Sequence, residues 1–396
     1  MKSIFSIMTI AFLCISGCHF NRSNAANNET LAIQDAINAT PTIQDAINVT
    51  PTIQVAILLD TSNSMDGLIN QAKSRLWNIV NTLTTLRFNG KAPDIQIALY
   101  EYGNDGLRKA DNFIRLVAPL TTDLDLISEK LFALATNGGL EYCGAVIKKA
   151  ANELRWSTND KDIHLIYIAG NEPFTQGNIA YSEAINDALG KKITVNTIHC
   201  GDRNEGIEGQ WKAGADKGNG QFFNIDHNAH IRYIITPYDV RIDECNILLN
   251  KTYISYGAHG ESSKMNQTAQ DHNAASISSS NKVERIVSKS GKAYKNTAWD
   301  LIDLVTEDEA ALQTIKQSDL PKELQGKSTA ELKTYIQQKN EERTAIRQEI
   351  ETLAKQRQAY MEAESKKSNA AAGDDLGQAI NRSVMDIAKN KGYKVE

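Results

Sequence analysis

The feature that most constrains this chain is an apolar run that ends in an acidic residue and two hydroxyls. Residues 55–59 are all apolar, and Asp60, Ser62 and Ser64 follow them at the spacing D-x-S-x-S. A short apolar run is typical of a buried strand, and a parallel α/β sheet binds ligands outside the carboxyl ends of its strands. Carboxylate and hydroxyl oxygens suit a hard cation such as Mg2+ or Ca2+. The motif therefore predicts a divalent-cation site where the first strand ends.

Strand-like and helix-like segments alternate from residue 52 to about residue 240. This alternation is typical of a parallel sheet with crossover helices, so it predicts an α/β fold for this part of the chain. Strands are predicted near 53–59, 94–101, 112–117, 164–169, 193–200 and 220–225, and helices near 66–86, 123–135, 142–155, 178–190 and 205–217.

With this order of elements, the D-x-S-x-S turn resembles the start of the metal-ion-dependent adhesion site (MIDAS) of von Willebrand factor type A (vWA) domains. The resemblance covers about residues 52–240. It implies a mostly parallel six-stranded sheet with helices on both faces, a divalent ion at its top edge, and a binding role without catalysis. It also implies a protein partner whose Asp or Glu carboxylate completes the coordination of the ion. The stretches 137–144, 169–177 and 196–201 look like a bacterial envelope subfamily of these domains.

Two loops depart from the family pattern. The family usually supplies a Thr from a second loop and an Asp from a third, whereas this chain has Glu141 near the first position and Gly170 at the second. Taken with the resemblance, the exchange implies that Glu141 restores the charge of the site. Asn171 or Glu172 would contribute directly or through water. A degenerate, metal-free crevice is the alternative that these residues leave open.

The N-terminus has the pattern of a secretory signal. Lys2 precedes an apolar stretch at 4–15, which is too short to span a membrane. The following ISGC resembles a bacterial lipobox, which implies cleavage after residue 17 and lipidation of Cys18. The alternative is an ordinary signal peptide with an incidental cysteine. Residues 19–24 lack the acidic cluster of some surface-exported lipoproteins, so we expect an anchor in the bacterial outer membrane that faces the periplasm.

Segments on either side of the α/β part are predicted to be less regular. Residues 18–51 are predicted to form a flexible tether, in which a ten-residue repeat (LAIQDAINAT, PTIQDAINVT) precedes the first strand, PTIQVAILLD. An added edge strand is the alternative for this repeat. Residues 241–327 are predicted to form a helix and a loop-rich connection, with 257–282 as loop because Ser, Asn, Gly and His are frequent there.

A long charged helix is predicted at 328–364, followed by a disordered tail at 365–396. Ser328 and Glu331 have the spacing of a capping box at the start of this helix. A coiled coil with a partner and a helix that belongs to this chain alone both remain open. The helix carries an apolar seam of Leu332, Ile336, Ile346, Ile350, Leu353 and Tyr360, which is interrupted by Lys339, Arg343 and Arg357.

Three cysteines remain after Cys14 leaves with the signal and Cys18 is lipidated. Cys143 and Cys200 either form a disulfide or remain separate thiols, and Cys143 with His199 allows a hydrolase as a further alternative.

The formal net charge of −5, without a basic run, argues against nucleic acid as the main partner. The preferred prediction is a lipid-anchored binding module without enzymatic activity that needs a divalent metal. An envelope scaffold that acts through its C-terminal helix, with a metal-free vWA platform, is the main alternative.

Overall fold

The computed structural model describes residues 50–367 and 375–396. The predicted signal peptide, the lipidated Cys18 and the tether up to residue 49 lie outside these residues. None of the helices within the described ranges is long and apolar enough to cross a membrane.

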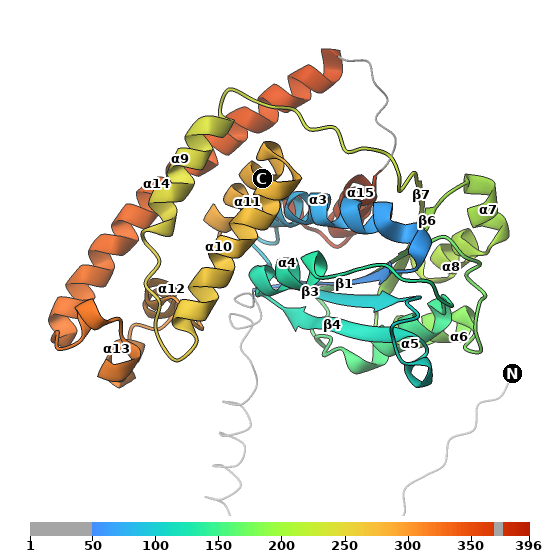
Figure 1. The fold of residues 1–396 in the computed structure, drawn as a ribbon, viewed down its shortest axis with the longest axis horizontal. Coiled ribbons are helices and arrows are strands. Elements are labelled where there is room, and N and C mark those ends of the chain that lie inside the picture. Colours follow the sequence, from blue (N-terminus) through green and yellow to red (C-terminus); the bar gives the residue numbers. More distant parts are fainter. Residues whose placement is uncertain (1–49, 368–374) are drawn as a thin grey trace, which may run out of the picture. The chain divides into compact units, whose positions relative to one another are not determined.

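A six-stranded sheet in the order β4-β3-β1-β5-β6-β7 forms the centre of the fold (Figure 1). Strand β4 pairs antiparallel with β3, and the other strands run parallel, which confirms the predicted mostly parallel sheet. The central strands are apolar almost throughout because helices cover both of their faces. The strands are β1 (Thr52–Asp60), β3 (Asp94–Tyr102), β4 (Ile114–Thr121), β5 (Ile163–Gly170), β6 (Thr194–Cys200) and β7 (Asn219–Ile225).

Helices cover the two faces of this sheet, as predicted. Alternate side chains of a strand point to opposite faces. Accordingly, Ile57 and Leu59 of β1 belong to one core cluster, whereas Ala56 and Leu58 belong to another. The first cluster is covered by α3 (Asp66–Thr84), α4 (Leu124–Phe132) and α15 (Leu376–Asn390). The second cluster is covered by α5 (Cys143–Glu153), α6 (Tyr181–Gly190) and α8 (Trp211–Lys217). The short helix α7 (Arg203–Glu208) lies next to α8.

The end of the chain is ordered, so the prediction of a disordered tail at 365–396 is wrong for the described residues. Asp375 caps α15, and Leu376, Ile380 and Val384 of this helix are buried in the first core cluster. After α15, strand β8 (Lys394–Val395) pairs with β2 (Leu86–Arg87). The prediction failed because a run of small residues before position 375 hid the apolar spacing of the helix behind it.

A group of helices is inserted between β7, the last strand of the sheet, and α15. The side chain of Gln71 on α3 holds both ends of this insertion. Its Nε2 donates to the Asp226 carbonyl at 2.8 Å, and its Oε1 accepts from the Leu376 N–H at 3.1 Å. The inserted helices are α9 (Asp239–Asn250), α10 (Gly260–Ile277), α11 (Ser279–Ser290), α12 (Leu301–Glu307), α13 (Ala311–Thr314) and α14 (Thr329–Lys367).

The loop predicted at 257–282 is instead α10 and the start of α11. The buried side of α10 is largely polar and includes Gln267, Gln270 and Asp271. A helix that buries polar side chains shows no apolar periodicity in its sequence, and this is why the prediction was wrong.

The long helix α14 begins with the predicted capping box. The Ser328 N–H donates to Glu331 Oε2 at 2.8 Å, and the Glu331 N–H donates to Ser328 Oγ at 3.3 Å. Its seam packs against α9, α11 and α12 of the same chain. Arg343 and Arg357, which interrupt the seam in sequence, are buried in ion pairs with Asp300 and with Asp239, respectively. The seam is therefore not available for a coiled coil with a partner.

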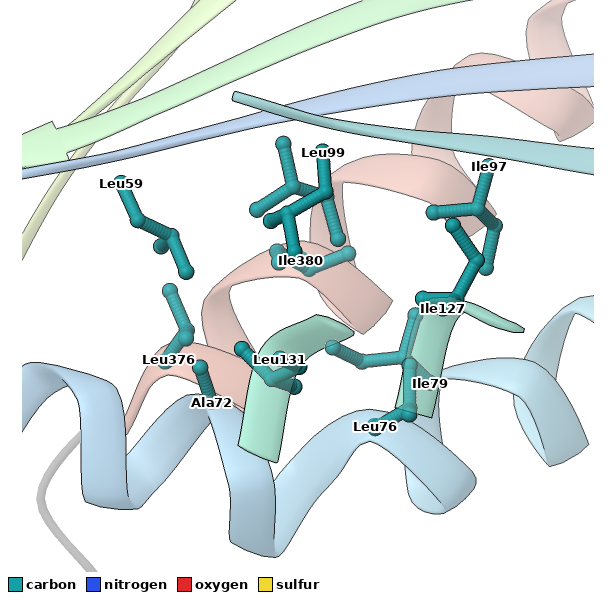
Figure 2. A pocket seen from close by; sticks show the side chains of 11 residues that line it. Leu59, Ala72, Leu76, Ile79, Ile97, Leu99, Ile127, Leu131, Leu376 and Ile380 are labelled. Atoms are coloured by element: carbon teal, nitrogen blue, oxygen red, sulfur yellow. The ribbon is translucent and has the colours of Figure 1, made fainter. Parts of the chain in front are cut away.

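A small cavity of about 20 Å³ lies where α15 meets the sheet (Figure 2). Its lining is apolar throughout, and α15 contributes Leu376 and Ile380. Ala72 of α3, whose side chain is a single methyl group, lines the same cavity. A cavity with such a lining offers a water no hydrogen-bond partner, so we expect it to be dry.

Candidate metal-binding site

The D-x-S-x-S turn follows β1 and leads directly into α3. The Asp60 side chain is fully buried, and its Oδ1 accepts a hydrogen bond from the Ser62 N–H at 2.7 Å. Ser62 Oγ lies 3.4 Å from Ser64 Oγ, which is exposed at the rim. Thr61 points into the interior instead, where its Oγ1 donates to Glu101 Oε2 at 3.3 Å. The alternation predicted from the sequence therefore places the acid and the two serines together.

The second loop brings Glu141 against Asp60. Gly103 lies between them: a Cβ on this residue would come within 2.7 Å of Glu141 Cγ and 2.8 Å of Asp60 Oδ1. Two backbone contacts fix the loop, because the Asn137 N–H donates to the Thr61 carbonyl and the Glu141 N–H donates to Gln176 Oε1. The Glu141 side chain is only 3% exposed.

Burial makes this pair of carboxyl groups electrostatically unfavourable without a cation. Burial raises the pKa of Asp60 to about 6. Burial, and next the charge of Asp60, raise the pKa of Glu141 to about 9. The charge of Glu172, which is half-buried at the rim, adds to both shifts. A bound dication would reverse these effects, because it stabilises the ionised form of every nearby carboxylate.

Several oxygens at this edge lack a hydrogen-bond partner. Among the described residues, Asp60 Oδ2, Glu141 Oε2 and Asn171 Oδ1 are buried and unpaired. Asn171 also reaches the turn, since its Nδ2 lies 3.4 Å from Ser64 Oγ. Buried polar atoms without partners are rare in native structures, and a cluster of them fits an ion or water. The donors are all oxygens, so they fit a hard divalent cation.

The described residues contain no group of three or more His, Cys, Asp or Glu side chains arranged to hold a metal. The donor set found here has two buried carboxylates, Asp60 and Glu141, and otherwise relies on the hydroxyls of Ser62 and Ser64 and the amide oxygen of Asn171. This donor set thus contains two acidic side chains, fewer than the three that such a group needs.

Position 170 of the third loop has no room for a carboxylate side chain because Tyr102 and Asp60 fill the space next to Gly170. A Cβ on Gly170 would lie 2.5 Å from the Tyr102 hydroxyl oxygen and 3.1 Å from Asp60 Oδ2. The Tyr102 hydroxyl donates to the Ala169 carbonyl at 3.0 Å, which fixes the ring in this place. Tyr102, the last residue of β3, and Gly103, which follows it, were not identified as site residues from the sequence, although β3 is a neighbour of β1.

Of the two alternatives that the sequence leaves open for Cys143 and Cys200, the structure has separate thiols and no disulfide. The three cysteines in the described part of the chain, Cys143, Cys200 and Cys245, are free thiols. Cys143 and Cys200 belong to different core clusters, on opposite faces of the sheet. The spacing in sequence had placed both near one edge of the sheet but could not tell which face each side chain occupies.

The hydrolase alternative is not supported by the geometry. The ring nitrogens of His199 lie 3.0 Å from Asn224 Oδ1 and 3.2 Å from the Asn171 carbonyl oxygen. Cys143 lies 3.9 Å from the Tyr102 hydroxyl oxygen. Burial raises the pKa of the Cys143 and Cys200 thiols well above the usual value, whereas a nucleophilic cysteine needs a lowered pKa.

Comparison with known proteins supports the interpretation of the fold. Residues 54–235 match the family model of the von Willebrand factor type A domain. A comparison with curated protein sequences found no match.

Among solved structures, BatB from Bacteroides thetaiotaomicron is 18% identical, with 44% of this chain and 90% of that chain covered and a TM-score of 0.34. An aerotolerance-related membrane protein from Bacteroides fragilis is 17% identical, with 44% and 93% covered and a TM-score of 0.31. Proximal thread matrix protein 1 from the mussel byssus, with a zinc-occupied MIDAS motif, is 14% identical, with 45% and 43% covered and a TM-score of 0.34.

The sheet order, the D-x-S-x-S turn at the end of β1 and the family match agree with one another. Residues 54–235 of this chain therefore form a von Willebrand factor type A domain, a module that usually mediates interactions between proteins.

Proposed function

We propose that this protein is a lipid-anchored protein of the bacterial cell envelope whose vWA domain binds a protein ligand through Mg2+ or Ca2+. The observation that carries the proposal is the set of buried oxygens at one edge of the sheet that have no partner among the described residues. Asp60 and Glu141 would supply the charge, and Ser62 and Ser64 the hydroxyl ligands. Asn171 would complete the protein's share of the shell.

A carboxylate of the protein ligand would take the remaining position on the ion. Ser64 is exposed and Asn171 is half-buried, so the site opens to solvent on the side where a partner would approach. The lipid on Cys18 would hold the domain at the outer membrane, facing the periplasm. The scaffold alternative is less well supported, because the apolar seam of α14 is covered by the chain's own helices.

The test is the shift in melting temperature that Mg2+ or Ca2+ causes in the full-length mature protein. An ion that binds only the folded state stabilises it by about 2.7 kcal/mol at a concentration of 100 times its Kd. Asp60→Asn should abolish this shift, and Glu141→Gln should strongly reduce it. Glu208→Gln, which removes an exposed carboxylate on α7, is the matched control and should keep the full shift.

The shift caused by the ion must be compared, and not the melting temperature alone, since removing a buried charge can itself stabilise the ion-free protein. If Glu172→Gln loses the shift while Glu141→Gln keeps it, the compensating carboxylate is Glu172. A wild-type protein that no divalent ion stabilises would contradict the metal site. Capture of a partner from envelope extracts should also disappear when a chelator is added.

A further inference from the structure

The edge of the sheet opposite the metal-binding site carries a group of lysines. This edge is where β1 begins, and the Thr52 N–H is held there by Asp162 Oδ1 at 2.9 Å. The lysines come from three segments that are distant in sequence: the turn before β5, the turn after α6 and the turn after α15. We call this group the lysine edge, and it consists of Lys161, Lys191, Lys192 and Lys391, which are all exposed.

Hydrogen bonds place these lysines next to one another. Lys391 Nζ donates to the Asp162 carbonyl at 2.5 Å, and the Tyr393 hydroxyl donates to the Lys161 carbonyl at 3.2 Å. Lys191 Nζ donates to the Ala151 carbonyl at 2.8 Å, which fixes it on the same side. Partial burial lowers the pKa of Lys391, Asp162 and Asp160 oppose this shift, and the charge of Lys192 adds to it. Lys391 and Lys192 are therefore close enough to repel each other.

Nearby acids neutralise only part of this charge. Asp160 forms an ion pair with Lys192. Asp162 is buried, and its carboxylate accepts from the Thr52 N–H and from Asn159 Nδ2. Further cations on the same segments, Arg155, Lys389 and Lys394, are exposed, but so are the acids Glu153, Asp386 and Glu396, so the excess charge comes from the four lysines of the edge. The lysine edge is thus a positive surface on a protein whose formal net charge is −5.

We propose that the lysine edge docks on the anionic phospholipid headgroups of the membrane to which the protein is anchored. The covalent path of the chain favours this occupant, because the described residues begin at Thr50, next to this edge, and any N-terminal lipid is attached through that point. This orientation rests on the proposed lipid anchor, whereas the charge of the edge does not. Each lysine near an anionic surface strengthens binding about fivefold.

The docked orientation would point the metal-binding site away from the membrane. Strand β1 has nine residues and joins the lysine edge to Asp60. At about 3.3 Å per residue, the strand separates the two by roughly 30 Å. A protein ligand in the periplasm could then reach the ion without contact with the lipid surface.

The experiment uses full-length protein with Cys18→Ser, so that no acyl chain contributes to binding. Sedimentation with vesicles is measured for phosphatidylcholine alone and for phosphatidylcholine mixed with phosphatidylglycerol. We expect binding to the mixed vesicles only. This binding should be lost at high salt, because added ions shorten the Debye length and screen the attraction between lysines and headgroups. The triple variant Lys161→Gln, Lys191→Gln and Lys192→Gln should weaken binding by about a hundredfold or more.

A matched triple variant on α14, with Lys333→Gln, Lys355→Gln and Lys367→Gln, has the same change in charge and should bind like the parent protein. Equal weakening by both triple variants, or equal binding to neutral and mixed vesicles, would overturn the proposal. The Mg2+-induced shift in melting temperature of the lysine-edge variant should be unchanged, so failure of this proposal can be distinguished from failure of the metal site.

Discussion

The sheet domain and the inserted helices are stabilised in different ways. The sheet domain buries apolar side chains on both faces, and all residues of β5 and nearly all of β1 are buried. The inserted helices bury charged side chains as well: Arg285, Lys289 and Arg343 are fully buried. Apolar burial stabilises a fold without directional requirements, whereas a buried ion pair is favourable only in one geometry. The insertion can therefore pack against the sheet domain in one register.

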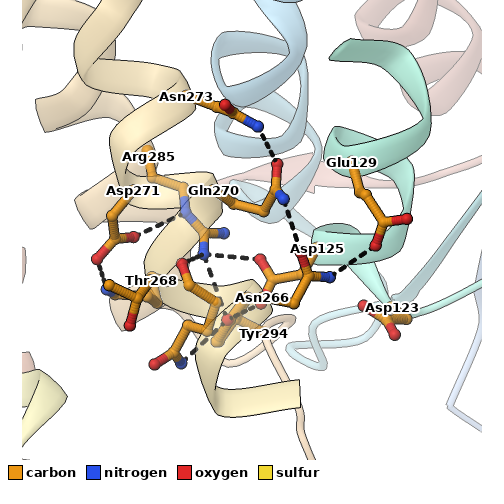
Figure 3. A network of polar contacts seen from close by, with 12 residues as sticks. Asp123, Asp125, Glu129, Asn266, Thr268, Gln270, Asp271, Asn273, Arg285 and Tyr294 are labelled. Atoms are coloured by element: carbon orange, nitrogen blue, oxygen red, sulfur yellow. Dashed lines mark hydrogen bonds and ion pairs between the residues drawn. The ribbon is translucent and has the colours of Figure 1, made fainter. Parts of the chain in front are cut away.

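The contact between the two regions shows this most clearly (Figure 3). Arg285 of α11 lies 2.7 Å from Asp125 of α4 and 3.1 Å from Asp271 of α10. The Tyr294 hydroxyl donates to Asp125 Oδ2 at 2.5 Å, and Lys289 pairs with Asp271 at 2.6 Å. One buried network thus joins a helix of the sheet domain to two helices of the insertion.

The largest effect is expected from breaking this network. Arg285→Ala leaves Asp125 and Asp271 without their shared cation, and removal of one partner from a buried pair costs about 3–5 kcal/mol. Urea denaturation would measure this loss. Arg241→Ala, which removes an exposed arginine paired with Glu349, is the matched control and should change the stability little, because solvent screens exposed ion pairs. Similar losses in both variants would show that the network does not hold the regions together.

An effect of the opposite sign is expected at Glu284, where the two regions also meet. Its side chain on α11 is 8% exposed, and burial raises its pKa to about 7, although Arg357 of α14 and Arg75 of α3 oppose this shift. The folded state therefore keeps a proton that the unfolded state releases at about pH 4.5, so stability falls as the pH rises between 4.5 and about 7.

Glu284→Gln removes this dependence. A shift from 4.5 to about 7, at about 1.4 kcal/mol per pH unit, gives a gain of about 3 kcal/mol at most at pH 8 and almost none at pH 4. Denaturation at both pH values would measure the difference. An equal gain at pH 4 and pH 8 would mean that the substitution acts through packing and not through ionisation.

The smallest effect is expected in the sheet domain, where packing can adjust gradually. Ile380→Val enlarges the cavity of Figure 2 by one methylene and should cost about 0.5–1.5 kcal/mol. Ala72→Val adds atoms to the same cavity, so it should cost less than Ile380→Val or even stabilise the fold. Thermal unfolding of the two variants would measure these changes in stability. A loss above 3 kcal/mol for Ile380→Val would contradict the expectation, because the sheet domain would then be as sensitive to one substitution as the ion-pair network.

The same difference explains which parts could be predicted from the sequence. In the sheet domain, apolar runs such as residues 55–59 and the D-x-S-x-S turn predict both the strands and the edge that holds the candidate site. In the insertion, the side chains that position α11 and α14 are Arg285 and Arg343, and charged residues in a sequence are normally taken as exposed. The contact of Glu141 with Asp60 was predicted through the family resemblance, but the part played by Tyr102 depends on packing that no spacing reveals.

The large separation in sequence between α15 and the strands that it covers has a consequence for how the protein folds during synthesis. During synthesis from the N-terminus, the strands of the sheet leave the ribosome well before residues 375–396, which supply the helix that covers one face. Contacts between residues so far apart in sequence form late and slowly. One face of the sheet therefore lacks part of its apolar cover until residues 375–396 have been synthesised.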